Sequence, residues 1–189
     1  MLGVLVALAL LLDGADILAR HYATDKVAAR IKAREPTAHG VSVHIRSFPF
    51  LKLLANGHVD EIGARIASLQ VGALVFAVDV ELHGLKVQQT SLFQGQVNVK
   101  SLRTGTVTVT VTATALSKAL GKTVTLGSGG ITLRLTNRTL VIAGGLVASY
   151  ALPGPDVLPC APALSVNGQT ATLSCAFTQV PSTFASLGT

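Results

Sequence analysis

Alternation of apolar and polar residues with a period of two runs through much of the chain after residue 40. In the clearest stretch, Val107, Val109 and Val111 alternate with the threonines from Thr106 to Thr112. Successive side chains of a β-strand point to opposite faces of a sheet, so this pattern gives one aliphatic and one polar face. Similar alternation covers residues 41–46, 76–83 and 131–136, and residues 59–69 are a further strand candidate. The chain is therefore predicted to form an antiparallel sheet with one wet side.

Short turn and helix signals separate these strand candidates. Asn137-Arg138 and Asn167-Gly168 have the composition of two-residue hairpin turns. Residues 113–120 are a short helix candidate, with Gly121 near the end. Gly127–Gly130 is interpreted as a turn, because no helix follows it as a phosphate-binding loop would require.

The N-terminus begins with an unbroken apolar run from Leu2 to Leu12. Its length fits the core of a signal peptide and is short of the ~20 residues that span a bilayer. No basic residue precedes this run, and no clear cleavage site follows it. From Ile17 to Ile31 apolar residues recur near helical spacing, until Pro36 ends the pattern. We interpret residues 1–23 as a signal-anchor or uncleaved signal segment, and residues 24–189 as one α+β domain.

Two alternatives stay open for this segment, namely a cleaved signal peptide and a buried helix of a soluble protein. The first interpretation predicts an exported protein, at the cell surface or in the periplasm, tethered to the cytoplasmic membrane. Basic residues are frequent between Arg20 and Lys52, and such a stretch behind an apolar run favours either an anionic membrane surface or a solvated helix face. Nucleic acid is not an expected partner, because aromatic residues make up 4% of the chain and Trp is absent.

Cys160 and Cys175 are the only cysteines in the sequence. Cys160 lies seven residues before Asn167, and Cys175 lies seven residues after Gly168. Equal spacing about a two-residue turn would place them opposite each other, so a cross-strand disulfide is predicted rather than two buried thiols. Such a bond also agrees with export, because disulfides persist in oxidising compartments.

The sequence contains none of the common catalytic or metal-binding motifs, so no catalytic residue, metal or cofactor is predicted. Asp79, Glu81 and His83 share one face of a predicted strand, a row that is more often a solvent-exposed surface than a metal site. The same surface interpretation applies to the other polar residues considered for acid–base chemistry or for contact with a phosphate headgroup, which are His58, Asp60, Glu61, Arg65 and Arg103.

The positive case is for an apolar ligand. A sheet with one aliphatic face must cover that face, and only one long helix and one or two short ones are predicted to do so. If they leave a gap, an apolar groove lies between helix and sheet, and acyl chains fit such a groove. The apolar residues of the strand at 76–83 are the candidate lining: Phe76, Val78, Val80 and Leu82. A well-closed core without a groove is the alternative.

Three segments together resemble the LmeA-like phospholipid-binding proteins of actinobacterial cell envelopes. They read GADILARHYATDKVAARI (residues 14–31), SFPFLKLLANGHVDEIGARI (residues 47–66) and DVELHGLKV (residues 79–87). The ordered set is fairly specific, although each piece alone is weak. The resemblance fades after about residue 145.

This resemblance implies a non-enzymatic envelope protein that binds phospholipid, for example of the phosphatidylinositol type, and supports lipoglycan handling at the outer face of the cytoplasmic membrane. The implied fold is similar to tubular lipid-binding (TULIP/BPI-like) domains, with a long N-terminal helix packed against a highly curved antiparallel sheet. It places Phe48, Phe50, Leu51 and Leu54 at the mouth or lining of the lipid cavity. The alternatives are a structural or partner-binding protein that holds a peptide in the groove, and an enzyme or non-catalytic activator of lipoglycan synthesis.

Overall fold

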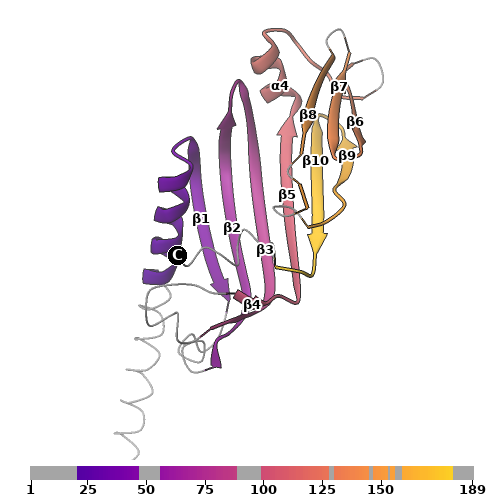
Figure 1. The fold of residues 1–189 in the computed structure, drawn as a ribbon. Coiled ribbons are helices and arrows are strands. Elements are labelled where there is room, and N and C mark those ends of the chain that lie inside the picture. Colours follow the sequence, from indigo (N-terminus) through magenta and orange to yellow (C-terminus); the bar gives the residue numbers. More distant parts are fainter. Residues whose placement is uncertain are drawn as a thin grey trace, which may run out of the picture.

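The computed structural model describes residues 21–46, 56–88, 99–127, 130–144, 147–152, 154–155 and 159–180. It is an α+β structure in which one helix lies beside the edge of a large antiparallel sheet, and a smaller sheet lies at the other end (Figure 1). This confirms the predicted class. The N-terminal helix is described over residues 21–34, so a long helix is not supported, and the pattern before residue 21 lies outside the described residues.

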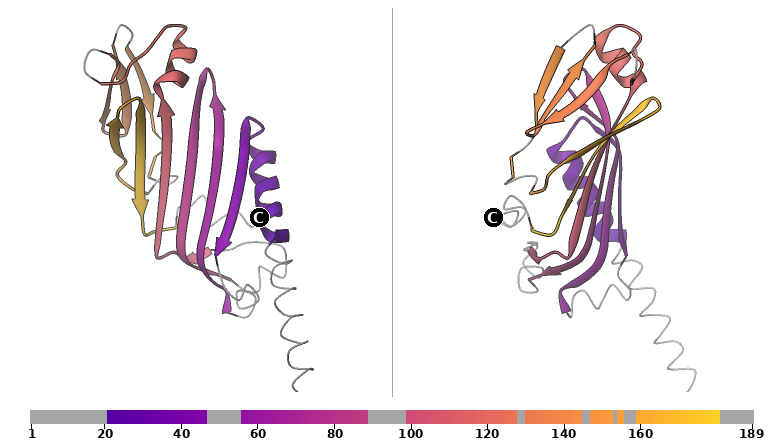
Figure 2. Two further views of the ribbon diagram at one scale, coloured as in Figure 1. Left: turned by 180° about the vertical axis from the view of Figure 1, so that it is seen from behind. Right: turned by 90° about the vertical axis from the view of Figure 1, so that its right-hand side faces the viewer.

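The main sheet has seven strands, in the order β1-β2-β3-β5-β10-β9 with β4 paired to the end of β3. It is open, with β1 at one edge and β9 at the other (Figures 1 and 2). Its strands are β1 (Ala38–Arg46), β2 (His58–Val71), β3 (Leu74–Val87), β4 (Val99–Ser101), β5 (Thr104–Thr112), β9 (Ala163–Asn167) and β10 (Thr170–Phe177).

The smaller sheet is inserted between β5 and β9. It consists of β6 (Thr132–Thr136), β7 (Thr139–Ala143) and β8 (Val147–Ala151), in the order β6-β7-β8. Asn137 and Arg138 form the predicted turn between β6 and β7, and both have positive φ, as a type I′ hairpin requires. The strand stretches predicted from alternation therefore fall within strands of the two sheets, except that Ile131 precedes β6.

The short helix α4 (Ala113–Leu120) connects the two sheets and has the predicted bounds. Thr112 caps its start, because the threonine Oγ1 accepts a hydrogen bond from the Ala115 backbone N–H at 3.2 Å. Gly121 adopts the left-handed conformation that ends the helix. The helix buries Leu116 almost completely, which anchors it to the protein interior.

Two separate clusters of buried apolar residues lie at opposite ends of the main sheet. The first joins α4 to the smaller sheet and contains Leu116, Val124, Ile131, Leu133 and Ile142. The second lies near β4, where Ala23 of the N-terminal helix packs against a group of four buried residues, which are Ile45, Val59, Leu85 and Val87. Burial at both ends fixes the long strands β2 and β3 between them.

The disulfide between Cys160 and Cys175 is present, as predicted, with a Cα–Cα distance of 5.8 Å. The predicted turn, however, is wrong by one residue: Asn167 pairs with Thr170, so Gly168 and Gln169 form the turn. Gly168 has φ +57°. Mirror-image hairpin turns need a positive φ at their first central position, and glycine adopts it without strain. Cys160 consequently lies before β9. The disulfide joins the segment that precedes β9 to β10, and it does not link two paired residues of β9 and β10.

We expect replacement of both cysteines by alanine to lower the free energy of unfolding by about 3 kcal/mol, because the bond closes a loop of 15 residues. Equilibrium urea denaturation measures this change. Reductant should destabilise the wild-type protein by a similar amount and leave the double variant unaffected. Complete alkylation of both cysteines in the folded, unreduced protein would contradict the bond.

Candidate functional site

The register of the main sheet gathers its aliphatic side chains on one face. Directly paired residues of neighbouring strands point to the same face. One row of such pairs runs across five strands and consists of Val43, Ala64, Val80, Val107 and Cys175. A second row lies nearer α4 (Val41, Ile66, Val78, Val109 and Leu173), and a third lies nearer β4 (Ile45, Ile62, Leu82, Gly105 and Phe177). We call these fifteen residues the apolar face.

The apolar face is closed at its ends and accessible in its middle. Towards α4, the buried cluster packs against Val111 and Leu164 of the main sheet. Towards β4, Ile45 is buried and the neighbouring Ile62 and Leu82 pack against the second cluster. In the first two rows every residue except Cys175 is only half-buried. An aliphatic surface that is continuous but incompletely covered is a candidate binding surface for an apolar ligand.

Gly105 and Phe177 complete the apolar face at the β4 end. The Phe177 ring lies across Gly105, and a Cβ atom on that glycine would approach the ring atoms to 2.5 Å and Leu82 Cδ2 to 3.0 Å. Both Gly105 and Phe177 are buried. The glycine therefore lets the ring lie flat on the sheet and close this end of the face.

The opposite face of the same strands is polar. Glu61, with 21% of its side chain exposed, lies 3.2 Å from His44 Nε2, 3.4 Å from Arg46 Nη1 and 4.0 Å from His83 Nδ1. Arg65 pairs with Asp79 across the strands, with Nε and Oδ1 separated by 3.7 Å. Their partial exposure makes these pairs weak contributors to stability. The described residues contain no group of three or more His, Cys, Asp or Glu side chains that could hold a metal ion.

The remaining polar candidates also lie at the surface. His58 Nε2 is 3.3 Å from Asp60 Oδ1 at the start of β2, and both side chains are well exposed. Arg103 lies beside Gly84, and its backbone N–H donates to the His83 carbonyl oxygen at 3.1 Å. Glu81 is exposed on β3.

The structure divides the predicted lipid-contacting residues into two groups. Val78, Val80 and Leu82 lie within the apolar face, and Phe76 pairs with Leu69 closer to the tip of the β2–β3 hairpin. The other predicted contacts lie outside the described residues: Phe48, Phe50, Leu51 and Leu54. Their role in binding stays a prediction. The residues of β1, β2, β5 and β10 in the apolar face were not predicted as lipid contacts. Apolar residues at every second position in these strands were the signal that could have identified them.

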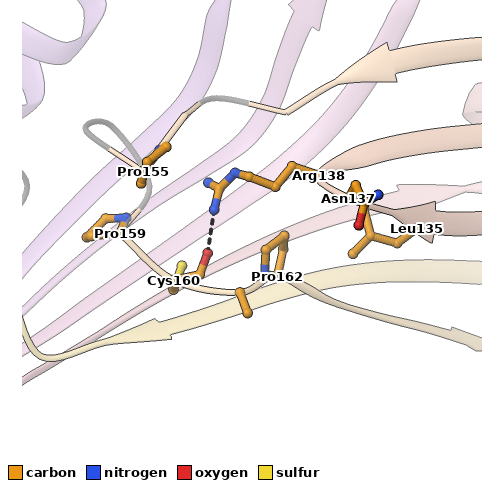
Figure 3. A pocket seen from close by; sticks show the side chains of 8 residues that line it. Leu135, Asn137, Arg138, Pro155, Pro159, Cys160 and Pro162 are labelled. Carbon is orange, nitrogen blue, oxygen red and sulfur yellow. Dashed lines mark hydrogen bonds between the residues drawn. The ribbon is translucent and has the colours of Figure 1, made fainter.

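Two of the pockets among the described residues stand out, and neither is lined by the N-terminal helix or by the segment from Phe76 to Leu82. One, of about 580 Å³, lies between the β6–β7 turn and a proline-rich segment (Figure 3). Arg138 Nη1 donates to the Cys160 carbonyl oxygen there at 2.7 Å, so the arginine joins the turn to the disulfide segment. The second, of about 480 Å³, lies around Gly105 and Phe177. The predicted groove between helix and sheet is therefore not confirmed.

Fold and site together define an α+β protein with an open antiparallel sheet and one continuous aliphatic face. The chain belongs to the LmeA-like phospholipid-binding family, whose sequence model matches residues 14–185. The match extends beyond the region in which the resemblance was apparent and includes both cysteines. Comparisons with curated proteins and with solved structures find no match. Within the described residues, no helix has both the length and the hydropathy needed to cross a bilayer.

We expect Gly105→Ala to lower the free energy of unfolding by about 1–3 kcal/mol, because the added methyl group would displace the Phe177 ring. Urea denaturation of the variant measures the loss. Gly154→Ala is the matched control, because a Cβ atom there meets no atom within 4 Å, and its effect should stay within about 0.5 kcal/mol. Equal stability changes at the two positions would show that the ring does not constrain Gly105.

Proposed function

We propose that this protein binds a phospholipid by laying its acyl chains on the apolar face of the main sheet. Membership of a phospholipid-binding family supports lipid as the ligand in general. The observation that carries the location is the half-buried state of aligned aliphatic side chains in the middle of that face. No charged residue belongs to its three rows, so an acyl chain there would not desolvate any charge.

The dimensions and chemistry of the apolar face suit this role. Five strands at a spacing of about 4.8 Å make the face about 19 Å wide, enough for an extended acyl segment to lie across several strands. Each methylene group transferred from water to such a surface contributes about 0.8 kcal/mol. Aliphatic side chains impose little directional selectivity on a hydrocarbon, so we propose that a separate contact selects the headgroup, for example of the phosphatidylinositol type.

We further propose that binding takes place outside the cytoplasm, at the outer face of the cytoplasmic membrane, and supports lipid or lipoglycan handling without catalysis. The apolar run from Leu2 to Leu12 supports export and a tether. The disulfide supports an oxidising compartment. The weak, partly exposed ion pairs of Glu61 and of Arg65 with Asp79 on the polar face support a binding rather than a catalytic role. A TULIP-like wrapping of the ligand by helix and sheet is part of this proposal.

Native mass spectrometry of the purified full chain tests the proposal directly. We expect adducts with the mass of one or two phospholipids that disappear when the protein is delipidated and return after incubation with phospholipid vesicles. A protein that is lipid-free as purified and takes up no phospholipid would contradict the proposal. A stoichiometric peptide or protein on the apolar face, without lipid, would instead favour the partner-binding alternative.

Substitutions on the two faces of β5 test where the lipid binds. Val109 and Thr110 are adjacent, both half-buried, and point to opposite faces of the sheet. We expect Val109→Glu to lower phospholipid uptake by about tenfold or more, because a carboxylate would be buried beside the acyl chains. Thr110→Glu, the control, should retain wild-type uptake. Circular dichroism of both variants checks that they fold, and equal uptake by both would place the lipid elsewhere.

A further inference from the structure

The N-terminal helix has one side turned to the protein and one side turned to solvent. Ala23 packs against the buried cluster near β4, and the other half-buried residues of the helix are Thr24, Ala28 and Ile31. Figure 1 and the left view of Figure 2 place this helix beside β1, the edge strand of the main sheet. Its remaining surface is therefore available for contact with something outside the domain.

Basic residues dominate the solvent-facing side. Lys26, Arg30 and Arg34 follow at intervals of four residues, so they form a stripe along the helix, and all three are exposed. Lys32 is a fourth exposed cation, whereas Asp25 is the single acidic residue of residues 21–34, which leaves the helix with a net charge of +3. The ion pairs found within the described ranges all lie on β1, β2 and β3, and none involves a cation of this helix.

Apolar surface accompanies this charge. Tyr22 begins the stripe with 67% of its surface exposed, and Val27 is 40% exposed. Lys26 Nζ lies 5.4 Å from the centroid of the Tyr22 ring, so cation and ring form one combined surface. Tyrosine is enriched at membrane–water interfaces, because its ring is apolar and its hydroxyl remains hydrated. Basic side chains interspersed with exposed apolar ones characterise helices that lie in the plane of a membrane surface.

We propose that the solvent-facing side of this helix docks the domain on an anionic phospholipid bilayer. The inference rests on the proposed function, because a lipid-binding protein must meet the membrane that supplies or receives its ligand. It adds the orientation of that encounter. Tyr22, Lys26, Arg30 and Arg34 lie in the headgroup region, parallel to the surface, and the edge strand β1 becomes the part of the sheet nearest to the membrane.

Co-sedimentation of the full chain with vesicles tests the docking surface. One vesicle type contains phosphatidylcholine alone, and the other contains phosphatidylcholine with phosphatidylglycerol. Each basic residue near an anionic surface contributes about fivefold to the partition coefficient, so Lys26→Gln with Arg30→Gln should lower binding to the anionic vesicles about 25-fold. Binding to neutral vesicles should change little. Any contribution of residues 2–12 is common to all variants and cancels in the comparison.

Two matched controls separate this surface from general charge and general aromatic effects. Lys118→Gln with Lys122→Gln removes the same charge from exposed positions at the α4 end, and should lower binding several times less than the helix pair. Tyr22→Ala should weaken binding to anionic vesicles severalfold, whereas Tyr150→Ala, at a tyrosine that is 46% exposed on β8, should not. Equal losses for the two charge pairs, or no preference of the wild type for anionic vesicles, would overturn the proposal.

Lipid content measured on the same proteins distinguishes failure of docking from failure of lipid binding. The Lys26→Gln, Arg30→Gln variant, delipidated and then exposed to phospholipid in detergent micelles, should show the wild-type phospholipid adduct by native mass spectrometry. A retained adduct together with lost vesicle binding supports the docking surface. Loss of the adduct in this variant would show that Lys26 and Arg30 belong to the lipid site itself, and would overturn the assignment of the solvent-facing side as a separate surface.

Discussion

The cross-strand register of the main sheet is the constraint on which the rest of the structure depends. Side chains alternate between the two faces of a sheet, so a slip of one residue would send the aliphatic residues of one strand to the polar face. The pairs Ala64–Val80 and Val80–Val107 show that three central strands keep the same phase. Because β1 and β10 keep it as well, the aliphatic side chains of the three rows all lie on one face, and polar side chains lie opposite them.

Stability and binding are assigned to different parts of this sheet. The buried clusters lie at the ends, where α4, the smaller sheet and β4 provide the packing partners. The middle of the apolar face contributes less burial, since its side chains are only half-covered. Hydrophobic stabilisation is roughly proportional to the apolar area removed from water. Covering the exposed aliphatic side chains with a ligand would remove more of this area from water than folding alone does. An apolar ligand on this face would therefore stabilise the fold as it binds.

Local patterns predicted the elements well, because their causes are local. Alternation identified most of β1, β3, β5 and β6, and α4 was predicted from the short segment between the Thr112 cap and Gly121. What could not be predicted was the pairing of distant strands: β5 pairs with β10, almost sixty residues further along the chain, and nothing in either sequence specifies that partner. The β2–β3 hairpin was also missed, although Gly72 marks its turn.

Only part of the candidate site could be predicted from the sequence, because the rest depends on the pairing of distant strands. The residues of β3 were selected because one strand shows its own alternation, whereas the neighbours that complete the surface depend on the register. The disulfide is a related case. Symmetry about Asn167-Gly168 predicted the right pair of cysteines. The actual turn, at Gly168-Gln169, lies one residue later. The position opposite Cys175 therefore moves by two residues, and Cys160 lies outside the ladder. The bond tolerates this shift because Cys160 precedes β9, where the backbone is not held by strand pairing.

Charge is distributed as unevenly as hydrophobicity. After His83 the sequence contains seven basic residues and one acidic residue, Asp156, so a large part of the domain is cationic in addition to the N-terminal helix. A general positive field attracts the whole molecule to an anionic surface but does not orient it, because its sources are spread over both sheets. Orientation requires a local surface where cations and exposed apolar groups coincide. The helix provides one at Tyr22 and Lys26, beside the edge of the sheet whose apolar face is proposed to receive the lipid.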